Sequence, residues 1–278
     1  MEDTRTYPSG VPCWIDIEPA DADAAQRFYG GLFGWSFTDA MPPGAPGYYL
    51  IAELDGRPVA AIAAPEPVST GSWNTYVAVD DADGAAEAAR AAGASVTSAP
   101  QDAGPAGRWA EIDDPTGGRL RLWQAGYRAG AQAVNAPGAW NFSDLHTADP
   151  TRARAFYGSL FGWEADDVGG GAAMWRRPGY GDHLAATVDP GIAERQAAVG
   201  APPGFADVVA WLKPLSDGES PHWHVTFAVE DRDTAVGVAE RFGGSIVSGP
   251  HDDAWTRSAV VSDPQGAVFT LSQFAPQR

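Results

Sequence analysis

The chain has 278 residues, a length that suits about two domains. Apolar residues make up 44% and aromatic residues 11%, so the sequence can bury hydrophobic cores and wholesale disorder is excluded. The 36 acidic and 18 basic residues give a net charge of -18, which argues against a nucleic-acid partner because phosphates require basic surfaces. No apolar run approaches the roughly 18 residues of a membrane-spanning helix. The first ten residues lack a signal-peptide pattern, and the single cysteine, Cys13, fits a reducing compartment, so we expect a cytoplasmic protein.

The chain repeats itself. Residues 28–35, Phe-Tyr-Gly-Gly-Leu-Phe-Gly-Trp, return at 156–163 as Phe-Tyr-Gly-Ser-Leu-Phe-Gly-Trp. Residues 73–83 match 223–233, and the Asp-Pro-Thr-Gly segment that begins at Asp114 matches the Asp-Pro-Gln-Gly segment that begins at Asp263. Three matches in the same order indicate a duplication.

The first predicted elements are a strand, a helix and a hairpin. Residues 14–18 alternate between apolar and polar side chains, which predicts a strand. Asp21 is a candidate N-cap for the helix that carries the repeated motif, and Gly34 suits the left-handed residue that ends it. Residues 48–54 and 58–64 predict a hairpin, since the intervening Asp-Gly pair is a favoured turn.

Later segments repeat this plan of a strand, a helix and a closing strand. These segments are 75–79, 81–92 and 119–123 in the first half, and 225–229, 231–242 and 268–272 in the second. The stretch 127–137 is rich in Ala, Gly and Pro and indicates a linker between domains at 8–126 and 138–275. The second domain has an expected insertion at 189–221, which is either a binding loop or lid, or a surface elaboration.

This order of elements, with the Phe-Tyr-Gly-x-Leu-Phe-Gly-Trp helix and the late Asp-Pro-x-Gly turn, resembles the vicinal oxygen chelate superfamily. That group includes glyoxalase I, bleomycin-resistance proteins and extradiol dioxygenases. The resemblance covers nearly the whole chain twice. It implies an α+β fold in which four βαβββ units form two tandem glyoxalase-like domains with cup-shaped mixed sheets. It does not fix the activity, because the superfamily hosts lyases, oxygenases and plain binders.

The resemblance also implies where a metal would bind, since the family's enzymes carry His or Glu ligands on the first and last strands of the units. Counted from the helix motif, these positions fall on Trp14, Asn74 and Arg121 in the first half and on Phe142, His224 and Thr270 in the second. Hairpin candidates near Ala61 and Ala185 are apolar. Divalent metals of this class require about three His or carboxylate ligands, so we expect no metal cofactor. A divalent metal is the alternative, because His146 shares a strand face with Asp144, and His222 shares one with His224, so a His/Asp site off the family's pattern could form. Otherwise these histidines are surface or hydrogen-bonded residues.

Strand alternation then names the side chains expected on the ligand face. They are Trp14, Asp16, Asn74, Tyr76, Arg121 and Trp123 in the first domain, and Phe142, His146, Thr226 and Thr270, with Trp211 from the insertion, in the second. Asp16 and Arg121 would form either a ligand clamp or a structural ion pair. Asp144 beside His224 would be either a catalytic pair, in which the carboxylate orients a general base, or a structural hydrogen bond.

The resemblance implies two functions, and these features agree with it. The first is metal-independent binding of a small aromatic natural product, either neutral or cationic, as an antibiotic-pathway accessory, sequestration or self-resistance protein. Related two-domain proteins accompany antibiotic pathways and are often labelled hydroxylases. The alternative is an enzyme, with either metal-free acid/base catalysis or an off-pattern metal for lyase or dioxygenase chemistry. In both cases we expect a monomer or a weak homodimer.

Overall fold

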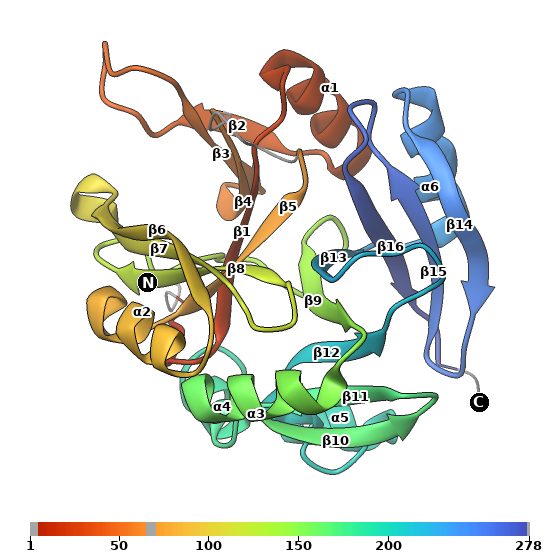
Figure 1. Ribbon diagram of the computed structural model, residues 1–278. Coiled ribbons are helices and arrows are strands. Elements are labelled where there is room, and N and C mark those ends of the chain that lie inside the picture. Colours follow the sequence, from red (N-terminus) through yellow and green to blue (C-terminus); the bar gives the residue numbers. More distant parts are fainter. Residues whose placement is uncertain (1–4, 65–70, 277–278) are drawn as a thin grey trace. The chain divides into compact units, whose positions relative to one another are not determined.

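A computed structural model describes residues 5–64 and 71–276 as four βαβββ repeats of an α+β fold (Figure 1). The first half contains β1 (Pro12–Ile17), α1 (Ala22–Phe33), β2 (Ser36–Asp39), β3 (Tyr49–Leu54), β4 (Arg57–Ala63), β5 (Trp73–Ala78), α2 (Ala82–Ala91), β6 (Ser95–Asp102), β7 (Gly107–Asp113) and β8 (Arg119–Ala125). The second half contains β9 (Trp140–Thr147), α3 (Pro150–Phe161), β10 (Glu164–Gly169), β11 (Ala172–Arg176), α4 (Tyr180–Thr187), α5 (Ile192–Ala198), β12 (Val208–Pro214), β13 (His222–Ala228), α6 (Arg232–Arg241), β14 (Ser245–Asp252), β15 (Thr256–Ser262) and β16 (Val268–Phe274).

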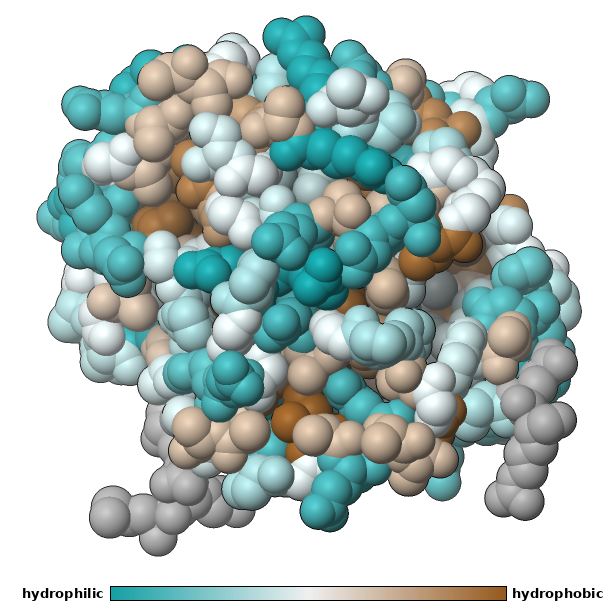
Figure 2. Space-filling view, turned by 90° about the horizontal axis from the view of Figure 1, so that it is seen from below, coloured by the Kyte–Doolittle hydropathy of each residue, from teal (hydrophilic) through white to brown (hydrophobic). Residues whose placement is uncertain are grey.

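The strands form two eight-stranded mixed sheets that are not closed into barrels. Hydrogen-bonded neighbours follow the order β2-β3-β4-β1-β5-β8-β7-β6 in the first sheet and β10-β11-β12-β9-β13-β16-β15-β14 in the second. The two orders are equivalent, strand for strand, as the duplication predicts. No helix within residues 5–64 and 71–276 is long and apolar enough to cross a membrane. On the face shown in Figure 2, hydrophilic residues predominate and strongly hydrophobic ones are scattered among them.

Local sequence signals set the ends of the elements where we predicted them. The Asp21 side chain accepts a hydrogen bond from the backbone N–H of Ala24 and so caps α1, and Gly34 ends this helix in the left-handed conformation. Between β3 and β4, Asp55 and Gly56 both have positive φ, which the primed turn of a two-residue hairpin requires. The predicted helix caps and hairpin are therefore confirmed.

The extra segment of the second half lies elsewhere than predicted. Helices α4 and α5 follow β11, and β12 comes after them and pairs in parallel with β9, as β4 pairs with β1. The additional residues therefore precede the last strand of this repeat rather than following it, which corrects the predicted position of the insertion at 189–221. Ala185 lies in α4, not in a hairpin, and Trp211 lies in the paired strand β12, not in a loop.

The described chain groups into two compact units, each of which takes one repeat from each half. The first unit comprises the segment that ends at Cys13, Thr75–Gly130 and Ser143–Trp223. The second unit comprises Trp14–Asn74, Ala131–Phe142 and the segment that begins at His224. Neither core is therefore made from a single half of the sequence.

In each unit a buried hydrogen-bond chain joins the two repeated sequence motifs. In the second unit, Trp73 Nε1 donates to Tyr29 Oη (3.2 Å), which in turn donates to Asp263 Oδ2 (3.0 Å). The other oxygen of Asp263 accepts the backbone N–H groups of Gln265 and Ala267 and so holds the Asp-Pro-x-Gly turn. The repeated tyrosine of one half is thus bonded to the repeated turn of the other half.

The first unit contains the same chain of hydrogen bonds. Trp223 Nε1 donates to Tyr157 Oη (3.0 Å), and Tyr157 donates to Asp114 Oδ2. Asp114 Oδ1 accepts the backbone N–H groups of Thr116 and Gly118. Because these groups are buried, they require partners that satisfy their hydrogen-bonding capacity, and here the partners come from both halves.

A Tyr29→Phe substitution tests the contribution of this chain. The ring stays but Asp263 loses its phenol donor, so we expect the free energy of unfolding to fall by about 1–3 kcal/mol. Urea unfolding measures this loss. The control is Tyr127→Phe, because Tyr127 is 67% exposed, and it should change stability by less than about 0.5 kcal/mol. Equal effects of the two substitutions would contradict the structural role of the hydrogen bond.

Candidate functional site

In the second unit, a fully buried carboxylate lies among polar groups from β1, β3 and β5. Asp16 accepts hydrogen bonds from Asn74 Nδ2 (2.9 Å) and Tyr49 Oη (3.2 Å). Trp14 Nε1 donates to the same Tyr49 oxygen (2.9 Å). The structure thus brings together Trp14, Asp16 and Asn74, which the sequence predicted, around a tyrosine that it did not. Tyr49 was missed because it reaches Asp16 from β3, two strands away in the sheet.

In the first unit, Arg121 lies between two aromatic rings. Its guanidinium carbon is 5.1 Å from the ring centre of Trp109 and 5.5 Å from that of Tyr76. Arg121 Nε donates to Glu111 Oε2 (3.0 Å), and Nη1 donates to Tyr76 Oη (3.0 Å). Arg121 is only 5% exposed, so its charge is held by these partners rather than by bulk water.

The strand register explains why these groups meet. Glu111 and Trp109 on β7 are opposite Arg121 and Trp123 on β8 in the antiparallel pair. Trp123 packs edge-on to Tyr76, and its Nε1 donates to the carbonyl oxygen of Arg128. Glu111 and Trp109 were not among the residues predicted for the ligand face. They are two residues apart on β7 and so lie on one face, but only the pairing of β7 with β8 shows that this is the face of Arg121.

In the second half, the predicted catalytic residues have separate partners in the described structure. Asp144, which is 2% exposed, pairs through Oδ2 with Lys213 Nζ (2.6 Å). Its buried Oδ1 makes no hydrogen bond within the described residues. His224 Nε2 lies 2.8 Å from Thr270 Oγ1, and Thr226 is the register partner of Thr270 on the neighbouring strand. A catalytic role for Asp144 and His224 remains a prediction.

The remaining predicted residues lie on β9 and β12. In this parallel pair, Trp211 is in register with Asp144, and Lys213 is in register with His146. Phe142 lies on β9 and is partly exposed. Lys213 was missed because its segment was predicted to be a loop, whereas a strand brings its ammonium group to the Asp144 carboxylate.

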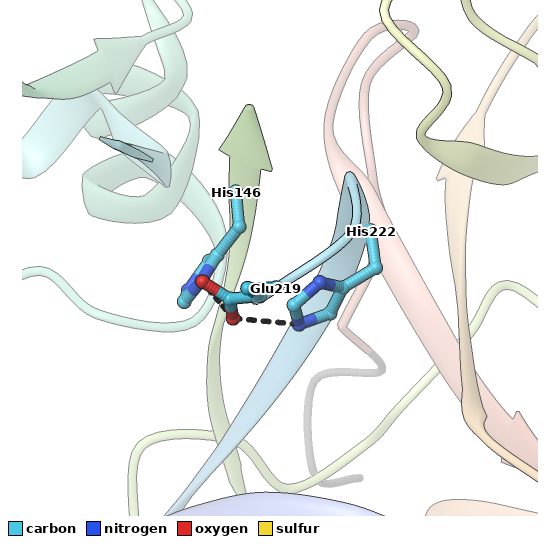
Figure 3. A group of neighbouring side chains, drawn as sticks. All are labelled: His146, Glu219 and His222. Atoms are coloured by element: carbon cyan, nitrogen blue, oxygen red, sulfur yellow. Dashed lines mark hydrogen bonds and ion pairs between the residues drawn. The ribbon is translucent and has the colours of Figure 1, made fainter. Parts of the chain in front are cut away.

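His146 belongs to a group that the sequence predicted only in part (Figure 3). Glu219, from the loop between β12 and β13, lies with Oε1 2.8 Å from His146 Nδ1 and 3.6 Å from His222 Nε2. Burial lowers the pKa of His146, although the nearby Asp144 and Glu219 carboxylates oppose the shift. Burial would raise the pKa of Glu219, but the Ser216 backbone N–H and the His146 ring outweigh it and lower the pKa. The neutral imidazole and the ionised carboxylate are therefore the favoured forms near neutral pH.

A surface hollow of about 600 Å³ lies in the second unit. It is lined by Ala20, Asp21, Ala22, Asp23, Gln26, Tyr48 and Leu50. None of the predicted ligand residues lines it. Its walls are the start of α1 and the edge of β3, so it does not mark the predicted ligand face.

Comparison with known proteins shows which superfamily the chain belongs to. Residues 14–122 match the Glyoxalase/Bleomycin resistance protein/Dioxygenase superfamily, and residues 140–272 match a glyoxalase-like domain. The protein "Putative glyoxylase CFP32" of Mycobacterium tuberculosis is 37% identical over the full length of both chains. The "Anthracycline biosynthesis protein DnrV" of Streptomyces peucetius is 33% identical and covers 96% of this chain and 94% of its own. The chain therefore belongs to the glyoxalase/bleomycin resistance protein/dioxygenase superfamily, as the repeated motifs indicated.

Solved structures with low identity share the fold. The Mn(II)-bound glyoxalase from Novosphingobium aromaticivorans has a TM-score of 0.61 at 15% identity, over 95% of this chain and 82% of its own. The 2,3-dioxygenase LapB from Pseudomonas sp. KL28 has a TM-score of 0.60 at 11% identity, over 98% of both chains. At these identities the likeness concerns the architecture alone.

The first-half residues that the resemblance implied for metal ligands do not fit a divalent cation. Trp14 offers only an N–H donor, Asn74 directs its amide donor to Asp16, and Arg121 is itself a cation. In the second half, Phe142 offers no ligand atom, and His224 and Thr270 bond to each other. A metal of this class binds about three His or carboxylate groups, and neither set supplies them.

A Lys213→Met substitution tests the pair that holds Asp144. Removing the ammonium group leaves a buried carboxylate without its partner, so we expect a loss of about 1–3 kcal/mol in urea unfolding at pH 7. The loss is modest for a buried ion pair, since the lysine side chain is 44% exposed and therefore screened by water. Adding Asp144→Asn should restore most of the stability. Additive losses in the double variant would mean that the two groups do not interact.

Proposed function

We propose that the chain binds a planar aromatic small molecule and does so without a metal ion at the family's ligand positions. The observation that carries this proposal is Arg121, which occupies one of those positions and lies between Tyr76 and Trp109. A guanidinium group repels a divalent ion, whereas it stacks well on flat π systems and donates several hydrogen bonds in one plane.

The surroundings of Arg121 supply what an aromatic ligand with oxygen substituents needs. Tyr76, Trp109 and Trp123 gather three aromatic rings around the guanidinium group, and the Tyr76 phenol accepts from Arg121 Nη1. Glu111 balances the arginine charge, so a ligand oxygen can share guanidinium donors without leaving a buried charge unpaired. Sites for flat ligands generally combine such aromatic walls with a few convergent polar groups.

The relatives favour the same chemical class. DnrV and the Streptomyces sp. protein DauV are named for anthracycline biosynthesis, and each is 32–33% identical over 96% of this chain. Anthracyclines carry a fused-ring aromatic core, and many bear a cationic amino sugar. The net charge of -18 would attract such a cation. We therefore propose a natural product of this kind as ligand, with the protein acting as a pathway accessory or by sequestration.

Titration of chelator-treated protein with an anthracycline aglycone, followed by tryptophan fluorescence, tests this proposal. We expect saturable 1:1 quenching that added Zn²⁺ or Mn²⁺ does not strengthen. An Arg121→Met/Glu111→Gln double variant removes the stacked cation together with its counter-charge, and should weaken binding about tenfold or more, since stacking and hydrogen bonds are both lost.

The matched control is Arg90→Met/Glu87→Gln, which makes the same two changes on the exposed face of α2. This control should bind the aglycone as the unaltered protein does. Binding that requires a divalent metal, or that is the same in both double variants, would contradict the proposal. Circular dichroism of each variant verifies that it is folded before the titrations are compared.

A further inference from the structure

The group formed by His146, Glu219 and His222 is the one set of three His, Cys, Asp or Glu residues in the described chain whose ligand atoms lie close enough to hold a metal ion. One ligand atom from each residue lies within 4.8 Å of the others. His146 is on β9, His222 is the first residue of β13, and Glu219 reaches them from the intervening loop (Figure 3). All three belong to the first compact unit.

Their geometry needs little change to accommodate an ion. Zn–N and Zn–O bonds of about 2.0–2.1 Å place tetrahedral ligand atoms about 3.3 Å apart. Glu219 Oε1 is already 3.6 Å from His222 Nε2, and the two imidazole rings are 4.8 Å apart at their centres. Glu219 Oε1 is 2.8 Å from His146 Nδ1, so this spacing has to open and the 3.6 Å spacing to His222 has to close, each by about 0.5 Å or less. Glu219 lies in a loop and His222 at the start of a strand, so rotation of their side chains can supply the change.

Two further contacts orient the ligands. His222 Nδ1 lies 2.9 Å from the carbonyl oxygen of Ser220, which can only accept a hydrogen bond, so Nδ1 carries the proton and the Nε2 lone pair faces Glu219. Glu219 Oε2 accepts the backbone N–H of Ser216 (2.8 Å), which leaves Oε1 directed at the histidines. Protein metal sites commonly orient their imidazole and carboxylate ligands through such outer contacts.

The local charges also suit a cation. Asp144 and Lys213 both lie near His146 but pair with each other, so their charges largely cancel. The Glu219 carboxylate then remains as the local negative charge. The side chains of His146, Glu219 and His222 are 16%, 24% and 37% exposed, so an ion can enter from solvent.

We propose that His146, Glu219 and His222 form a Zn²⁺ site that is displaced from the family's metal positions. Two imidazoles and one carboxylate form a donor set that suits zinc. Three protein ligands leave one tetrahedral position for water or for an oxygen atom of a small molecule. The bound ion would also tie the loop that carries Glu219 to β9 and β13. This site shares no residue with the Arg121 cluster and does not depend on the proposed ligand.

Calorimetric titration of the full chain with ZnSO₄, using protein prepared without a histidine tag and treated with chelator, tests the site. We expect one ion per chain with micromolar or tighter affinity. Glu219→Gln and His222→Gln should each weaken binding by about tenfold or more, because each removes a direct ligand. Zinc should also raise the melting temperature of the unaltered protein by mass action, but much less in the two variants.

The matched controls are Glu194→Gln and His251→Gln, which make the same changes at exposed positions outside the group. Both should bind zinc as the unaltered protein does. Absence of zinc binding, or equal binding by ligand variants and controls, would overturn the site and indicate adventitious surface binding only. Since both ligand variants alter partly exposed side chains, their metal-free stability should match that of the controls. The aglycone titration starts from metal-free protein, so its result is independent of this one.

Discussion

The fold depends on a buried hydrogen bond between a tyrosine of one half and a turn carboxylate of the other. Tyr29 bonds to Asp263 in the second unit and Tyr157 bonds to Asp114 in the first. Burial, and then the adjacent carboxylate, raise the pKa of Tyr29 well above its ordinary value, so the phenol stays protonated and remains a donor. A carboxylate buried without that donor would be costly, which makes each half of the chain a requirement for the other.

Both partners of this bond lie in motifs that the sequence analysis identified, but the sequence did not predict that they form a hydrogen bond. Each motif was visible because it is repeated, and the caps and the Asp55–Gly56 hairpin followed from local chemistry. The segment that became β12 was misjudged because its apolar run, 208–212, has no local feature that separates a strand from a loop within a long insertion. Its pairing with β9 makes it a strand, and β9 is far from it in the sequence, so local patterns could not predict this pairing.

The same limit applies to the candidate sites. Alternation along single strands put Asp16, Asn74, Tyr76 and Arg121 on the predicted ligand face. In the structure Asn74 donates to Asp16 and Arg121 donates to Tyr76, partners that alternation did not specify. It could not supply Glu111 or Lys213, which come from neighbouring strands, nor Glu219, which comes from a loop. Each of these enters a site through strand register or loop closure, so its role depends on tertiary structure rather than on local pattern.

The positions that the family resemblance implied for metal ligands hold an Asn74–Asp16 hydrogen bond, a His224–Thr270 pair and an arginine beside two aromatic rings, while His146, Glu219 and His222 form a group on β9, β13 and the loop before β13. An anomalous-difference map from crystals grown with Zn²⁺ tests this directly. The account predicts a peak bonded to His146, Glu219 and His222, and none beside Trp14 and Asn74 or beside Arg121. A peak at either of those places, or one beside Phe142, His224 and Thr270, would contradict it.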